Sequence, residues 1–165
     1  MTLDEHIADL QGQFTNRLWT SFNNRFLGRT YRIAEKREQK VQPHQYLGAN
    51  EYRNVFYDDN YDSTIIFDIE PTSETITESV LNSDVNIIVA LDLGKIYGLN
   101  TIADEDAHKA VLNILSRSEF KVNNIVRGID AYNDFDLTDT QKIRYNRSPL
   151  YIFKLECSLQ HSYNC

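Results

Sequence analysis

The sequence predicts an α+β fold: a mostly antiparallel sheet with two helices packed on one face and an extended loop or arm. Three observations lead to this fold class. Two segments carry apolar residues at helical spacing, several others have the apolar runs or alternation of strands, and no βαβ unit repeats along the chain. The 165 residues are expected to form a single domain, residues 1–165, from which residues 29–62 can protrude as an arm or loop.

The N-terminal segment has the pattern of an amphipathic helix. Apolar residues recur at steps of three and four, with polar residues between them, at Leu3, Ile7, Leu10, Phe14, Leu18 and Phe22. This stripe predicts a helix over residues 3–24, with Gly28 as its end signal. The next segment, TYRIAE at residues 30–35, predicts a strand that runs into a charged turn.

The middle of the chain is expected to contain an arm and two strands. Residues 42–62 are rich in Tyr, Asn, Asp, Pro and Gly without a sustained period, which predicts a long loop or extended arm. Residues 63–70, STIIFDIE, predict a short strand. Residues 85–91, VNIIVAL, form a nearly continuous apolar run and predict a central, well-buried strand, with the polar residues 71–79 connecting the two.

One more helix and two more strands are expected towards the C-terminus. An acidic first turn followed by apolar residues at helical steps predicts a helix over residues 104–117. Residues 121–130 predict a strand and residues 131–141 a polar connection. The last segment alternates strictly, which predicts a strand with one buried and one exposed face. The buried set is Tyr151, Phe153, Leu155, Cys157 and Leu159, and the exposed set is Lys154, Glu156, Ser158 and Gln160.

Composition and charge exclude several classes of protein. The net charge of −7 and the pI near 5.0 oppose attraction to nucleic acid or anionic lipid, although a local basic patch stays open. The N-terminus lacks a secretion signal and no segment approaches membrane-spanning length, so the protein is expected to be made and kept in a cytoplasm. Cys157 and Cys165 are about 26 Å apart along an extended strand, which is too far for a disulfide bond. Cys157 also falls among the apolar positions of its strand, so it is interpreted as a small core residue.

The sequence offers little catalytic chemistry. The glycines match neither a dinucleotide-binding motif nor a P-loop, and the common hydrolase, redox and zinc signatures are absent. No catalytic, cofactor-binding or metal-binding residues are therefore predicted, and the protein is expected not to be an enzyme. The alternative is a Mg²⁺-dependent nuclease, because Asp92 after a buried strand resembles the first metal-binding carboxylate of ribonuclease H-like folds. Asp68 or Glu70 would complete that site.

Charge is distributed unevenly along the chain. Residues 54–94 contain nine acids and no Lys or Arg, whereas residues 25–40 carry a net charge of +4. Opposite charges on one molecule suit a head-to-tail contact between copies. The predicted subunit interface comprises Arg25, Arg29, Arg32, Lys36, Arg37, Lys40, Asp58, Asp59 and Asp62. Two alternatives stay open: the segments neutralise each other within one subunit, or the basic segment touches nucleic acid.

The order of elements resembles the tail-terminator and head-tail connector proteins of tailed bacteriophages. The resemblance covers the helix ending in TSFNNRF, the segment from TYRIAEK to YDSTIIFDIE, the strands VNIIVAL and KVNNIVRGID, the helix DEDAHKAVLNILSRS and the closing SPLYIFKLECSLQ. It implies a non-enzymatic virion protein, made in the host cytoplasm, that forms a ring at the neck or tail.

In that family, extended arms reach neighbouring subunits and the adjoining ring. The implied partners are copies of the chain itself and other virion proteins such as a portal, a connector or a tail tube, with passing contact to packaged DNA and none to a membrane. A protein-binding adaptor outside the virion is the remaining alternative.

Overall fold

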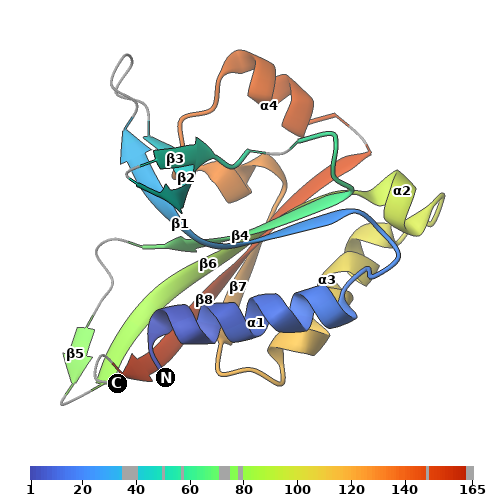
Figure 1. Cartoon of the computed structure of the whole chain (residues 1–165). Helices are drawn as coiled ribbons and strands as arrows, with labels where there is room; N and C mark the ends of the chain where they lie inside the picture. The colour runs from blue at the N-terminus through green and yellow to red at the C-terminus, as the bar shows by residue number, and fades with distance from the viewer. Residues whose placement is uncertain are drawn as a thin grey trace.

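A single mixed β-sheet is the frame of the protein (Figure 1). The computed structural model describes residues 1–34, 41–49, 51–56, 58–70, 75–77, 80–147 and 149–162. The strands in this part of the chain are β1 (Asn24–Ala34), β2 (Val41–Gly48), β3 (Glu51–Asn54), β4 (Ser63–Ile69), β5 (Thr75–Thr77), β6 (Val80–Asp92), β7 (Lys121–Arg127) and β8 (Leu150–Ser162). The helices are α1 (Leu3–Arg17), α2 (Leu93–Tyr97), α3 (Ala103–Leu115), the 3₁₀ helix η1 (Gly128–Tyr132) and α4 (Asp139–Tyr145).

The strand order is β3-β2-β1-β4-β6-β8-β7, with β5 beside the start of β6. The pair β1 and β4 is parallel, and the other recorded pairs are antiparallel. The α+β class and the mostly antiparallel character of the sheet are therefore confirmed. At the centre, β6 and β8 pair along their whole lengths, from Val80 opposite Ser162 to Asp92 opposite Leu150. The predicted central strand at residues 85–91 is confirmed, since its residues are all buried.

The first face of the sheet is the side that α1 and α3 cover (Figure 1). The apolar stripe of α1 packs there with that of α3, against odd-numbered residues of β4, β6 and β8. Thr2 and Glu5 form a capping box that satisfies backbone N–H groups at the start of α1. The predicted helix over 3–24 is too long, because α1 ends at Arg17 and Trp19 takes a positive φ of 48°. Gly28 does not end a helix; it lies inside β1.

The second face of the sheet is covered in part by η1 and α4 (Figure 1). The prediction of a polar connection over residues 131–141 was wrong. This segment contains buried aromatic side chains, and their irregular spacing forms neither a helical nor a strand pattern. Tyr132 and Phe135 are buried against this face, and the ring of Tyr132 stacks on that of Tyr145 with centroids 5.0 Å apart. This cover also buries Ile152 and Lys154 of β8, so the prediction that Lys154 is exposed was wrong.

The long loop predicted over residues 42–62 is largely sheet. β2 pairs with β1, and β3 pairs with β2, so residues 41–54 extend the sheet beyond β1. The chain reverses between them through Gly48 and Ala49, both with positive φ. The polar composition of this hairpin hid its extended conformation, since Pro43 interrupts the alternation that marks a strand. In the part of the chain that is described, no helix is long and apolar enough to cross a membrane.

Candidate protein-binding surfaces

Arg32, from the predicted interface, is engaged inside its own subunit. Its Nε and Nη2 atoms donate to the two carboxylate oxygens of Asp68 on β4, at 2.9 and 2.6 Å. The Asp68 side chain is only 1% exposed, and Arg32 also lies 3.7 Å from Glu70 and 3.4 Å from Asp134. The hydrogen bond to Asp68 is the main cause that raises the pKa of Arg32. This bidentate ion pair joins the basic and acidic segments within one molecule.

The other described arginines of the predicted interface also have partners in the chain. Arg25 donates to the carbonyl oxygen of Phe56 at 2.8 Å, and its guanidinium lies 5.0 Å from the centroid of the Tyr61 ring. Arg29 is 3.7 Å from the carboxylate of Asp4. Lys36, Arg37 and Lys40 lie outside the described residues.

The three acidic residues of the predicted interface lie at one end of the β1–β4 pair. The Asp58 side chain accepts hydrogen bonds from both the backbone N–H and the side chain of Asn60. Asp62 accepts from the backbone N–H of Asn23 at 2.9 Å. Asp59 is 82% exposed and pairs with Arg144 of α4 at 2.5 Å.

The charges that are separate along the sequence therefore meet in space. The parallel pairing of β1 with β4 sets Thr30 opposite Asp68, which brings the neighbouring Arg32 within reach of the Asp68 carboxylate. Of the alternatives left by the sequence, neutralisation within one subunit accounts for the described arginines. Among the six described residues of the nine, Arg29 and Arg32 contact Asp4 and Asp68 of their own chain, so the separation of charge along the sequence does not by itself argue for docking.

The carboxylates of the nuclease alternative are far apart. Asp68 is opposite Asn86 on β6, whereas Asp92 ends the same strand six residues later, about 20 Å away. Asp92 instead caps α2 by accepting a hydrogen bond from the backbone N–H of Lys95 at 3.0 Å. Within the described ranges, no group of three or more His, Cys, Asp and Glu side chains is arranged to hold a metal ion. These positions cannot share one Mg²⁺ ion.

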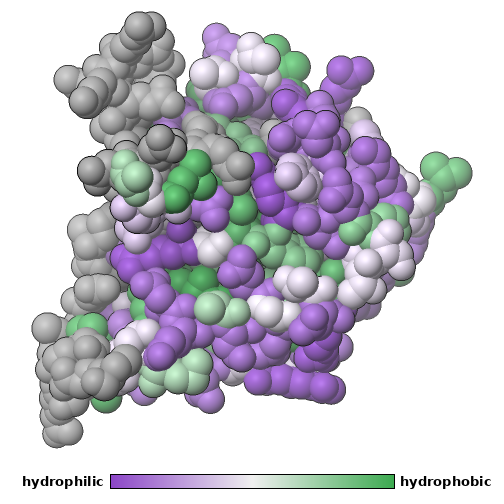
Figure 2. Space-filling view, viewed as in Figure 1, coloured by the Kyte–Doolittle hydropathy of each residue, from purple (hydrophilic) through white to green (hydrophobic). Residues whose placement is uncertain are grey.

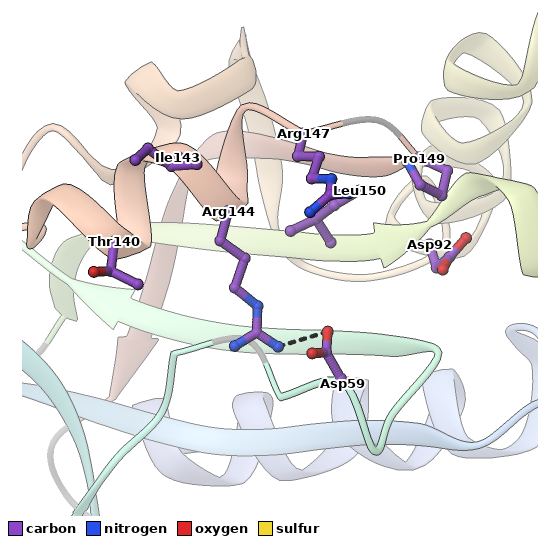
Figure 3. A pocket seen from close by; sticks show the side chains of 8 residues that line it. All are labelled: Asp59, Asp92, Thr140, Ile143, Arg144, Arg147, Pro149 and Leu150. Atoms are coloured by element: carbon purple, nitrogen blue, oxygen red, sulfur yellow. Dashed lines mark ion pairs between the residues drawn. The ribbon is translucent and has the colours of Figure 1, made fainter.

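A hollow of about 570 Å³ lies between α4 and the end of the sheet (Figure 3). Its lining includes the Asp59–Arg144 ion pair, the capping carboxylate of Asp92, and Arg147. Thr140 is the one hydroxyl among the described lining residues, and no hydrogen bond joins it to the carboxylate of Asp59 or Asp92, as an activated nucleophile would need. Carboxylates and guanidiniums line it in equal number, which gives it no net preference for a charged ligand.

One serine does contact a histidine. The hydroxyl of Ser83 is 2.8 Å from Nε2 of His161, but the two residues are 1% and 6% exposed on the first face of the sheet. His108 is also buried, and its Nε2 lies 2.7 Å from the hydroxyl of Tyr151. Both imidazoles are therefore buried and have hydrogen-bonding partners inside the fold.

The strand β7 is an exposed edge of the sheet. Among the described residues it pairs with β8 alone, and four of its seven residues are exposed. Arg127 at its end is held by Glu105 and Asp104 of α3, at 2.6 and 3.4 Å. Lys121, the first residue of β7, forms no ion pair with any other described residue. Such an edge offers backbone N–H and C=O groups to an added strand.

Exposed apolar side chains are a second accessible feature. Leu99 is fully exposed and Ile102 is 54% exposed, both in the turn between α2 and α3, and Ile143 of α4 is 71% exposed. Figure 2 shows apolar atoms projecting where this turn lies in Figure 1. Neither these residues nor the edge position of β7 was predicted from the sequence. The sequence does contain a signal for this turn, because Leu99 and Ile102 are apolar residues next to the turn-forming residues Gly98 and Asn100.

Comparisons with protein-family models, with curated proteins and with solved structures found no match to this chain.

Proposed function

We propose that this protein is a non-catalytic structural protein that acts by binding other protein chains, copies of itself among them. The observation that carries the proposal is the edge of β7 that no strand of the described residues covers, because an added strand can satisfy the backbone groups along it. The exposed side chains of Leu99, Ile102 and Ile143 support it, since contact with a partner would remove them from water.

The internal pairing of charged groups also supports a structural role. Arg32 and Asp68 stabilise the sheet, and the imidazoles of His108 and His161 are closed off from solvent. Leu99, Ile102 and Ile143 face solvent, and exposed apolar side chains suit contact with a protein partner.

The more specific form of the proposal is a ring at the head-tail junction or tail end of a bacteriophage. Its support is the order of elements, which resembles tail terminators and head-tail connectors. In this form the partners are other copies of the chain and the flanking virion proteins, such as a portal, a connector or a tail tube. Electron microscopy and peptide detection in purified particles test it, and absence from particles that carry complete necks and tails would contradict it.

The general proposal is tested by size-exclusion chromatography with light scattering, over a range of protein and salt concentrations. We expect an oligomer that persists near 1 M salt, where the Debye length is about 3 Å and surface charge pairs are screened. Strand addition and apolar contact survive that screening. A monomer at every protein concentration would contradict self-binding. Cleavage of DNA or RNA with Mg²⁺ or Mn²⁺, lost in Asp92→Asn, would contradict the non-catalytic role.

A further inference from the structure

The 570 Å³ hollow between α4 and the end of the sheet, called the α4 hollow below, continues towards the turn between α2 and α3. Pro149 and Leu150 line the α4 hollow and also a second hollow of about 410 Å³, which Asn100 and Thr101 of that turn line as well. Figure 1 shows α4 and the turn at the same end of the molecule, with the start of β8 between them. One concave surface therefore runs from α4, across Pro149 and Leu150, to the turn.

Leu99 is an apolar side chain that projects from a fixed turn. It is fully exposed, so it has almost no contact with the rest of its own chain. Asn100 holds the turn, because its Oδ1 accepts from the backbone N–H of Ile102 at 3.0 Å and its Nδ2 donates to Asp106 at 2.7 Å. Since the backbone is already ordered, binding through Leu99 would lose little conformational entropy.

The α4 hollow suits an apolar side chain better than a charged one. Its two carboxylates are engaged, since Asp59 pairs with Arg144 at 2.5 Å and Asp92 caps α2. Ile143, on the α4 side of the hollow, is 71% exposed. A leucine that entered the hollow would therefore remove the side chain of Ile143 from water together with its own.

The projecting leucine and the α4 hollow lie on the two sides of Pro149 and Leu150. A two-fold axis beside these two residues places Leu99 of each copy opposite the α4 hollow of the other, so one surface is complementary to itself.

The charges beside the two features agree with this arrangement. Arg147 lines the α4 hollow and forms no ion pair with any other described residue. The two-fold axis sets it near the first turn of the second copy's α3. That turn contains three acids, and Arg127 is the one described cation paired with it. The attraction between opposite charges favours a second copy as the occupant of the hollow.

We propose that two copies associate about this two-fold axis, with Leu99 of each inserted into the α4 hollow of the other, against Ile143. This inference rests on the proposed function, since it specifies one contact in self-assembly. The contact closes at two chains. None of the described residues that line the two hollows belongs to β7, so the edge of β7 is a separate surface for a further chain.

A substitution at Leu99 tests the contact by size-exclusion chromatography with light scattering. Leu99→Asp should raise the dissociation constant of the pair by more than about 100-fold, because burial of one leucine changes affinity by about 10- to 100-fold and the pair contains two. Circular dichroism should show an unchanged fold, since Leu99 is fully exposed in the single chain. Leu47→Asp is the matched control, because Leu47 is 51% exposed on β2, and it should leave the dissociation constant unchanged.

Disulfide trapping tests the symmetry. In a Cys165→Ser background, mild oxidation of a mixture of Leu99→Cys and Ile143→Cys chains should give a covalent dimer, and neither preparation alone should do so. A mixture of Leu47→Cys and Ile143→Cys chains is the control and should give none. Chains that carry both Leu99→Cys and Ile143→Cys should stop at two copies, whereas a ladder of longer products would contradict the two-fold axis.

The two readouts separate this contact from the proposed function. An oligomer that forms normally in Leu99→Asp and gives no trapped dimer overturns the Leu99 contact and leaves the proposed function standing. A wild-type chain that is monomeric at every concentration overturns both the contact and self-binding.

Discussion

Replacing Asp68 with Asn should lower the stability of the fold substantially. The Asp68 carboxylate accepts two hydrogen bonds from Arg32 and one from Asn86, and the side chain is buried. Asparagine has the same size, but its NH₂ group would have to face one of these donors. Breaking a buried ion pair by removing one partner costs about 3–5 kcal/mol. Because Arg32 is 17% exposed and keeps Glu70 and Asp134 nearby, we expect the lower end, about 3 kcal/mol.

Thermal unfolding followed by circular dichroism measures this loss. For a chain of this size, about 2–4 °C of Tm corresponds to 1 kcal/mol, so the Tm of Asp68→Asn should fall by about 6–12 °C. Glu119→Gln removes an exposed carboxylate and should leave the Tm unchanged. The double variant Arg32→Met with Asp68→Leu should recover most of the loss, because it leaves no unpaired buried charge. A drop below about 2 °C for Asp68→Asn would refute the internal role of this pair and return Arg32 to the candidates for a subunit interface.

Three further outcomes follow from burial and backbone geometry. Burial lowers the pKa of His108 from 6.5, so the unfolded chain binds a proton at a higher pH than the folded chain does. The stability of the fold should therefore decrease as the pH drops below about 6.5. In melts at several pH values, His108→Gln should reduce this dependence of stability on pH, and an unchanged dependence would assign it to other groups. Burial raises the pKa of the Cys157 thiol to about 12, so a Cys165→Ser variant should react with a thiol reagent at pH 8 only after unfolding. A prompt reaction of the native protein would contradict the burial of this thiol. Ala49 has a φ of 50°, so Ala49→Gly should raise stability by about 0.5–1 kcal/mol in denaturant titrations, and a loss would mean that the turn adapts to alanine.

The elements with strong periodicity could be predicted from the sequence. The apolar run at residues 85–91 and the stripe at 104–117 correspond to the core of β6 and to α3, because burial on one or both sides leaves a regular imprint. The alternation of β8 correctly identified its core face, including Cys157. It failed for Lys154, because the cover on the other face comes from aromatic residues of η1 and α4 with no period of their own.

The arrangement of charges and edges could not be predicted in the same way. Arg32 and Asp68 are 36 residues apart in sequence, and their contact depends on β1 pairing in parallel with β4. A run of acids and a run of bases therefore looks segregated until the strand order is known. Similarly, the residues of β7 read as an ordinary half-buried strand. The position of β7 at the edge of the described sheet depends on the spatial order of the other strands. The residues of β7 themselves do not encode that order.

The central place of β8 constrains how the chain can fold during synthesis. Its partners on β6 precede it by 58 to 82 residues, from Asp92 opposite Leu150 to Val80 opposite Ser162. Until β8 has left the ribosome, β6 and β7 each lack the neighbour that joins them, and two apolar strand edges stay open at once. We therefore expect the nascent chain to remain unfolded until translation has passed Ser162, and products that stop before Leu150 to aggregate.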